Sequence, residues 1–346
     1  MELTLYHKLA AAQKAAPSEF QPTSYWKPYT RAIESELRTL DPSKIRAGGS
    51  PILGTFGFQD YVYTQYGRSA WKQLALRSLQ NRILKDRRIL PYGLGLEDIR
   101  RGAWQFCEIT GQNSNARPLS GIEVTDYGAP EDLFIINDKK YTYAFLQYYL
   151  RYCFVQKHVG LTDKEVVVEI GSGSGYQVEV LKKLHPGLTV LCFDLPGPLV
   201  LCEHYLGKAL GPESIVSCGE TLDWKSLAQL QSGKVHFFGA WQIPLVTGAA
   251  IDLFWNAASF GEMELGIVKN YLSYITGSAN WVYLNQAAEG KETEGVNHVS
   301  QKIVWQDYCD FLSDYKLLER RVAVGPVGYA CGGHYFEALW TRNGDT

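Results

Sequence analysis

Residues 166–184 read VVVEIGSGSGYQVEVLKKL. The first five residues are typical of a buried parallel strand, and the last nine have the apolar spacing of a helix. Gly171, Gly173 and Gly175 lie between these two elements, where the chain must turn sharply and a ligand can approach the backbone closely. A glycine-rich loop alone is a weak signal. Its place between a strand and a helix predicts a nucleotide-binding turn.

The sequence around this turn predicts a parallel sheet. After residue 158, short apolar segments alternate with helix-length segments, which is the pattern of a parallel sheet covered by helices on both faces. A short glycine-rich link separates the last two strands, so we expect them to form an antiparallel hairpin. The fold class is therefore α/β, with a seven-stranded Rossmann-like sheet. The expected strands are residues 165–170, 189–193, 235–238, 252–256, 281–285, 315–322 and 335–340.

The first part of the chain has a different character. Residues 24–110 are rich in aromatic residues, and residues 70–84 carry apolar residues at every third or fourth position, which predicts helix. Residues 111–140 are polar and contain Asn, Pro, Gly and Asp in close succession, which indicates a long irregular connection. We therefore expect two parts: residues 1–140, a mainly helical region with its linker, and residues 141–346, a cofactor-binding domain that begins with a helix.

Composition excludes several classes of protein. The 346 residues are 46% hydrophobic, enough for one large domain with an added segment or for two domains. The formal net charge is -2 and the basic residues are dispersed, so we expect no nucleic acid as partner and no binding to a membrane surface. No secretory signal or membrane-spanning stretch is evident, which favours a cytoplasmic location. The sequence is compatible with a monomer or a homo-oligomer.

The glycine spacing discriminates between nucleotide ligands. A dinucleotide fingerprint G-x-G-x-x-G that begins at Gly171 would place glycine at position 176, which is Tyr176. The third glycine, Gly175, comes one residue earlier. This spacing argues against a nicotinamide oxidoreductase. The form E-x-G-x-G-x-G, which starts at Glu169, resembles the first motif of S-adenosylmethionine-dependent methyltransferases.

That resemblance implies roles for the loop and for the residue before it. The backbone of Gly171, Ser172, Gly173 and Gly175 is expected to lie under the methionine and ribose parts of the cofactor. Glu169 is expected to orient the methionine amino group, directly or through water.

The next two strands supply further candidates for cofactor binding. Asp194 ends a strand about twenty residues later, where a carboxylate accepts hydrogen bonds from both ribose hydroxyls, although an Asp there also serves as a helix N-cap. Asp194 and Leu195 belong to a D-L-P sequence that resembles the second motif of many O-methyltransferases. Ala240 and Trp241 follow the third strand, where this class contacts adenine. Trp241 either stacks on the base or fills the core.

More specifically, the chain resembles a family of sugar O-methyltransferases associated with polyketide glycosides and surface polysaccharides. Strand ends at this edge of the sheet face the ligand crevice, so Asn256 and Ser259 are candidates for contacts with the donor. The resemblance rests on the loop at 169–175, the D-L-P sequence at 194–196, the segment N-x-x-S-x-x-E-M at 256–263, Tyr271 and Asn285.

Methyl transfer to a hydroxyl requires removal of a proton. Glu262 follows the fourth strand and is the first candidate base, with a helix N-terminal carboxylate as its alternative role. His298 follows the fifth strand and would titrate near neutral pH, but a loop histidine is more often solvated or hydrogen-bonded than catalytic. His158 would reach the site only if the preceding helix folds over it.

The resemblance implies a reaction as well as a fold. We expect S-adenosylmethionine as cofactor, S-adenosylhomocysteine as product, and a small-molecule acceptor, a sugar or another hydroxylated metabolite, bound with help from residues 1–140. At least one tyrosine of residues 141–149 should line its pocket. We expect no metal, because Asn256 stands where an Asp ligand would be needed. The alternatives are an N- or C-methyltransferase and a cofactor-binding but inactive partner subunit.

Overall fold

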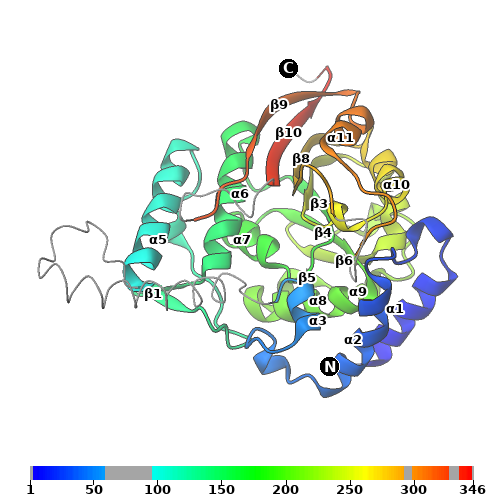
Figure 1. Ribbon diagram of the computed structural model, residues 1–346, viewed down its shortest axis with the longest axis horizontal. Coiled ribbons are helices and arrows are strands. Elements are labelled where there is room, and N and C mark those ends of the chain that lie inside the picture. Colours follow the sequence, from blue (N-terminus) through cyan, green and yellow to red (C-terminus); the bar gives the residue numbers. More distant parts are fainter. Residues whose placement is uncertain (1–2, 59–95, 292–297, 327–334, 345–346) are drawn as a thin grey trace, which may run out of the picture.

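The computed structural model describes residues 3–58, 96–291, 298–326 and 335–344. Figure 1 shows a central sheet with α6 and α7 on one side and α10 and α11 on the other. The layers are those of an open α/β fold. The sheet is formed by β3 (Val166–Ile170), β4 (Thr189–Asp194), β5 (Ile215–Val216), β6 (Val235–Gly239), β7 (Ile251–Ala257), β8 (Ala279–Ala287), β9 (Tyr315–Val322) and β10 (Tyr335–Arg342).

The order of the strands confirms the predicted fold class. The order is β5-β6-β4-β3-β7-β8-β10-β9. The six strands β3 to β8 are parallel to one another. β10 runs antiparallel to both β8 and β9, as expected for the last two strands. Seven strands are those predicted, and the eighth is the two-residue edge strand β5, which is too short to show a periodicity in the sequence.

Alternate residues of the central strands face different layers. Val167 in β3 and Val190 in β4 pack in the cluster that includes the helices α6 to α8, whereas Val168 and Leu191 pack in the cluster that includes α10. Burial of each such side chain stabilises the fold by about 1.5–3 kcal/mol. Both faces of β3 are therefore anchored, and the loop after Ile170 is held at the edge of the sheet. The covering helices are α6 (Tyr143–Val159), α7 (Tyr176–Leu184), α8 (Pro196–Leu210), α9 (Cys218–Thr221), α10 (Leu265–Ile275) and α11 (Trp305–Phe311).

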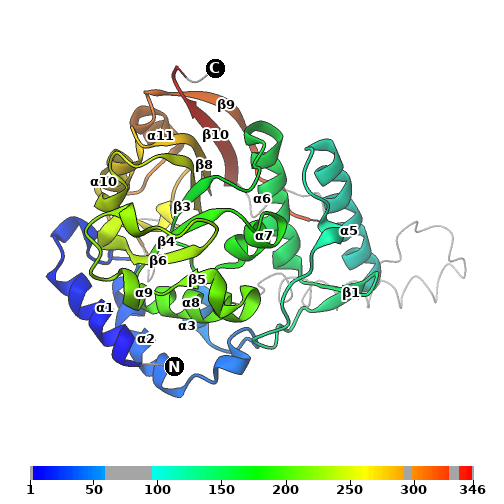
Figure 2. The same ribbon diagram turned by 180° about the vertical axis from the view of Figure 1, so that it is seen from behind.

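The described part of the N-terminal region is mainly helical, as predicted. The helices α1 and α2 lie against α8, and the reverse view in Figure 2 shows them beside α8 and α9. The helix predicted over residues 70–84 lies outside the described residues. The division of the chain at residue 140 stays a prediction. The helices of this region are α1 (Leu3–Ala15), α2 (Lys27–Thr39), α3 (Pro51–Thr55) and α5 (Leu96–Asn113).

The expected irregular connection over residues 111–140 is more ordered than its composition indicates. It contains the end of α5 and a short hairpin formed by β1 (Phe134–Ile136) and β2 (Lys139–Tyr141). Asn137 and Asp138 have φ values of 50° and 63°, the left-handed conformation that a two-residue hairpin turn requires. The strands are only three residues long, so their alternation was not visible among the polar residues.

Within the described ranges, no helix is long and apolar enough to cross a membrane.

Candidate functional site

A cavity lies at the carboxyl-terminal edge of β3, β4 and β7. β3 lies between β4 and β7, and the connections after β3 and β7 lead to opposite sides of it, so this edge is the crevice where open α/β sheets bind ligands. Three parts of the chain line the cavity: the strand ends with their loops, the helix α6, and N-terminal residues around Trp26 and Phe56.

The loop after β3 requires glycine at two positions that line the cavity. Gly171 has φ +74° and Gly173 has φ +51°. A Cβ at Gly171 would lie 2.4 Å from the Cβ of Ser259, and a Cβ at Gly173 would lie 3.0 Å from the carbonyl oxygen of Phe56. Gly171 N–H donates to the Phe193 carbonyl at 2.8 Å, which ties the loop to the end of β4. The turn is therefore bound closely on both sides.

Gly175 serves the packing of the fold rather than the cavity wall. It has φ +78° and caps α7. A Cβ there would lie 2.9 Å from Cys202 and from Leu206, both in α8. Gly175 was predicted to contact the cofactor, but it does not line the cavity. Gly171, Ser172 and Gly173 do line it.

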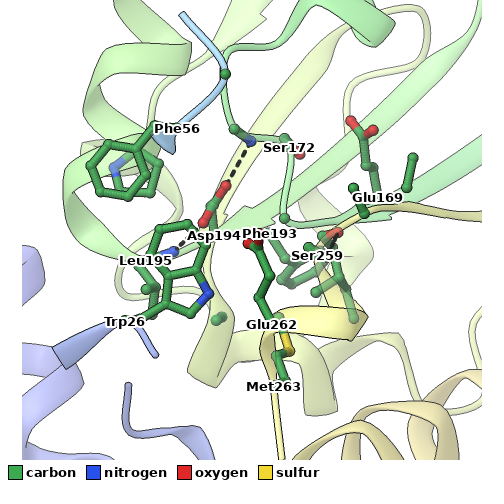
Figure 3. A pocket seen from close by; sticks show the side chains of 18 of the residues that line it. Trp26, Phe56, Glu169, Ser172, Phe193, Asp194, Leu195, Ser259, Glu262 and Met263 are labelled. Carbon is green, nitrogen blue, oxygen red and sulfur yellow. Dashed lines mark hydrogen bonds between the residues drawn. The ribbon is translucent and has the colours of Figure 1, made fainter. Parts of the chain in front are cut away.

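Asp194 lies at the centre of the cavity wall. Its carboxylate accepts hydrogen bonds from Gly173 N–H at 2.8 Å and from Leu195 N–H at 2.7 Å, as Figure 3 shows. The residue is 8% exposed. Burial raises the pKa of Asp194 to about 6, although the two backbone hydrogen bonds oppose the shift. The backbone thus fixes the carboxylate in place, and its remaining lone pairs can accept further hydrogen bonds.

One end of the cavity is polar. Glu169, which is 5% exposed, lines it together with Ser172, Gln177 and Arg151. Among the described residues, Gln177 Oε1 is buried at this end without a hydrogen-bond partner, and a hydrogen bond between Ser172 and Glu169 lowers the pKa of Glu169 against the effect of burial. Burial raises the pKa of Glu169 to about 8, and the Asp194 carboxylate acts in the same direction. A buried polar atom without a partner is costly, so this end is suited to a ligand that supplies donors.

The other end is apolar. Trp26 and Phe56 stack with their ring centroids 5.3 Å apart and their planes at 10°. Both line the cavity, as do Leu195 and Ala240. In Figure 3, Trp26 and Phe56 lie on one side of Asp194 and Glu169 on the other. This end can enclose a flat apolar ring system.

Glu262 reaches the cavity from the 3-10 turn η7 (Phe260–Glu262). Its side chain is 17% exposed, and Lys291 Nζ lies 3.0 Å from Oε1. Burial raises the pKa of Glu262, whereas Lys291 and Tyr25 oppose the shift by charge and hydrogen bonding. The Thr23 hydroxyl donates to the carbonyl oxygen of Glu262 at 3.1 Å, which ties the N-terminal segment to this turn.

Asn256 and Ser259 hold the loop after β7 against β3. The Asn256 side-chain amide donates to the Ile170 carbonyl and to Ser259 Oγ, both at 2.7 Å. Gln286 in turn donates to Asn256 Oδ1 at 2.5 Å. Ser259 lines the cavity, but Asn256 is fully buried beneath it. Asn256 therefore positions the loop, and a direct contact with a ligand is not available to it in this arrangement.

Besides Gly175 and Asn256, two further predicted residues lie away from the cavity lining, Trp241 and His298. The ring of Trp241 occupies the space that a Cβ on Gly239 would fill, and it packs against the core rather than the cavity. His298 follows β8 as expected but does not line the cavity, and its carbonyl oxygen accepts a hydrogen bond from Ser24 Oγ at 3.4 Å. His158 does not reach the cavity either, because it binds Glu319 at 2.8 Å.

Other lining residues were not identified from the sequence. Trp26 and Phe56 belong to an aromatic-rich segment in which nothing distinguishes site residues from core residues. Arg151 carried a signal, because it is the only charged residue between 143 and 155 in a mostly apolar helix. Tyr148 differs from these residues, because at least one tyrosine of residues 141–149 was expected at the pocket, and Tyr148 lines the cavity.

In the described part of the chain, no group of three or more His, Cys, Asp or Glu residues lies close enough to hold a metal ion. The expectation that the reaction needs no metal stays a prediction.

Comparisons with known proteins give structural matches alone. No family model matches the chain, and no curated protein matches it. A SAM dependent methyltransferase from Aquifex aeolicus is 15% identical, with 55% of this chain and 88% of that chain covered and a TM-score of 0.36. A S-adenosylmethionine-dependent methyltransferase from Clostridium acetobutylicum is 10% identical, with 58% of this chain and 92% of that chain covered and a TM-score of 0.41. M. capricolum TrmK, solved in complex with S-adenosylhomocysteine, is also 10% identical, with 56% of this chain and 68% of that chain covered and a TM-score of 0.36. At these identities and scores the function has to be inferred from the residues of the cavity.

Proposed function

We propose that the chain is an S-adenosylmethionine-dependent methyltransferase. One observation carries the proposal: a central, backbone-held carboxylate, Asp194, separates a polar cavity end at Glu169 from an apolar end at Trp26 and Phe56. S-adenosylmethionine has the same three parts in the same order, namely a charged amino acid, a ribose with two hydroxyls, and a flat base.

The residues of the cavity fit this cofactor part by part. Burial raises the pKa of Glu169 to about 8, and the positive charge of the ammonium group would favour its ionised form, which would accept a hydrogen bond from that group. The Asp194 carboxylate would accept from the ribose hydroxyls. Leu195 and Ala240 would contact the base, and the loop backbone from Gly171 to Gly173, which lines the cavity, would lie against the rest of the cofactor.

When bound, the cofactor supplies an electrophilic methyl group on a sulfonium centre. The chain itself contributes alignment and exclusion of water, which account for much of the acceleration in a displacement of this kind. Glu262 is placed to accept the proton of an acceptor hydroxyl, because its carboxylate lines the cavity and its raised pKa brings it nearer to neutral pH.

The acceptor that we propose is a sugar or another small hydroxylated metabolite. The segment at 256–263 supports it, since Ser259 and Glu262 both line the cavity and both belong to the resemblance to sugar O-methyltransferases. The proposal keeps a cytoplasmic location and a small-molecule partner. If a panel of candidate acceptors were methylated on nitrogen or carbon, the proposal of an O-methyltransferase would be replaced. The proposal that S-adenosylmethionine is the methyl donor would still hold.

Calorimetric titration with S-adenosylhomocysteine tests the donor site. We expect saturable binding, weakened about 100- to 10,000-fold by Asp194→Ala because two hydrogen bonds to a charged group are lost. Asp252→Ala is the matched control: this carboxylate binds Val166 N–H at 2.8 Å at the opposite end of β3. NAD⁺ should not bind. Absence of binding to the wild type, or a preference for NAD⁺, would overturn the proposal, and binding without turnover on any acceptor would favour an inactive partner subunit.

A further inference from the structure

We propose that Arg151, on the inner face of α6, binds the α-carboxylate of the cofactor, so that Arg151 and Glu169 together form a subsite for a zwitterionic amino acid. This inference rests on the proposed function and assigns a contact within the same cavity. It adds a cofactor-binding residue from outside the strand ends and their loops.

The charges at the polar end of the cavity require such a partner. The amino acid part of the cofactor carries one positive and one negative group. Glu169 matches the ammonium, but Glu169 and Asp194 alone would leave the α-carboxylate facing two acidic side chains in a buried site. A buried charge without a counter-charge is costly. Arg151 is the basic residue that lines the described cavity, and its charge acts on Glu169 to lower the pKa of that carboxyl group.

The position of Arg151 in the fold favours ligand binding. Its guanidinium carbon lies 4.9 Å from the ring centroid of Tyr148, one helical turn earlier, and both residues line the cavity. A ring beneath a guanidinium holds it in place by a cation–π contact. The planar guanidinium fork matches a carboxylate with two parallel hydrogen bonds, which a lysine cannot do.

A structural role for Arg151 is the competing explanation. Its charge also lowers the pKa of Glu337, a buried carboxyl group whose pKa is raised by burial. However, Glu337 already has a basic partner, because Arg321 donates to Glu337 Oε2 at 3.0 and 3.1 Å. Arg321 does not line the cavity. Arg321→Met is therefore the matched control, since it removes a positive charge from the same network without touching the proposed subsite.

The test compares two ligands that differ only in the carboxylate. S-adenosylhomocysteine and its decarboxylated analogue are titrated calorimetrically into the wild type, Arg151→Met and Arg321→Met. Because a charge-assisted contact is lost, Arg151→Met should weaken the binding of S-adenosylhomocysteine about 10- to 100-fold. The affinity for the analogue should stay within about twofold of the wild-type value. Arg321→Met should keep the wild-type ratio of the two affinities, whatever it does to stability.

Each other outcome has a distinct meaning. An equal loss for both ligands in Arg151→Met would make the residue structural and overturn the inference, as would unchanged affinity for both. If Arg151→Met does not fold, the wild type decides, because equal affinity for the two ligands would show that no basic group recognises the carboxylate. A wild type that binds neither ligand would instead remove the proposed function itself.

Discussion

The two walls of the cavity are built in different ways. The wall at the strand ends, from Glu169 to Gly173 and at Asp194, comes from segments that lie next to each other in the sheet and carry a readable motif. The facing wall joins Trp26 and Phe56 to the turn that ends at Glu262. We call these the motif wall and the cover. The cover depends on contacts between distant residues, such as the hydrogen bond from Thr23 to Glu262, 239 positions later.

The difference separates two functions of the site. The motif wall contains the groups that fit the donor, and local geometry fixes them, since backbone N–H groups hold Asp194 directly. The cover contains the candidate base and the aromatic pair. We therefore expect a change at Glu262 in the cover to affect turnover, a change in the aromatic pair to weaken donor binding only moderately, and changes in the motif wall to affect donor binding and folding.

The largest expected effect is on turnover in Glu262→Gln. Loss of a general base lowers kcat by about 100- to 10,000-fold, while the affinity for S-adenosylhomocysteine should stay near that of the wild type. The base must be ionised to accept a proton. Because burial raises the pKa of Glu262, the wild-type rate should rise with pH through that raised pKa, and the variant should lack this limb. Steady-state rates across a pH series measure both effects.

Glu264→Gln is the matched control for that variant. Glu264 lies two residues further on and accepts a hydrogen bond from Ser24 N–H at 3.2 Å, outside the cavity lining. Its loss should lower kcat by less than about tenfold, the size expected for one hydrogen bond. Near-normal turnover in Glu262→Gln would remove this carboxylate as the base and with it the division of labour between the two walls.

The next effect concerns Gly171 in the motif wall. Gly171→Ala should lower the free energy of unfolding by about 2–4 kcal/mol and abolish measurable donor binding, because a left-handed alanine is strained and its Cβ would lie 2.4 Å from Ser259. Gly248→Ala isolates the strain: it has φ +72° and nothing within 4 Å of a Cβ. The free energy of unfolding of that variant should fall by about 1 kcal/mol. Thermal unfolding and calorimetry give the two readouts, and equal losses in both variants would mean that the close approach to Ser259 is unimportant.

The motif wall was largely predictable, because its signals are local. Strand periodicity placed Glu169 and Asp194 at neighbouring strand ends, and glycine spacing identified the turn. Ser259 and Glu262 were also identified as candidates, since they follow a strand that ends at the same edge. Trp241 shows the limit of this reasoning: it follows the right strand, but Gly239 leaves a space that its ring fills.

The cover was not predictable in the same way. Trp26 and Phe56 resemble core aromatics in sequence, and the packing of α2 against α3 and α8 brings them together at the cavity. His298 shows the opposite error, because a residue in the loop after a strand has no direction fixed by its position in the sequence. Among the lining residues that were not identified from the sequence, Arg151 could have been found. It is a lone charge in an apolar helix, and such a charge is rare without a buried partner or a ligand.

The smallest effect tests whether the cover touches the donor at all. Trp26→Ala should weaken S-adenosylhomocysteine about tenfold, since one stacked aromatic contact is lost. It should weaken 5′-methylthioadenosine equally, because that ligand keeps the base and lacks the amino acid. Trp305→Ala is the control: its ring packs on Trp340 at 5.5 Å and does not line the cavity, so stability should fall without a change in affinity. Unchanged donor affinity in Trp26→Ala, with a raised KM for the acceptor, would assign the aromatic pair to the acceptor and leave the motif wall as the whole of the donor site.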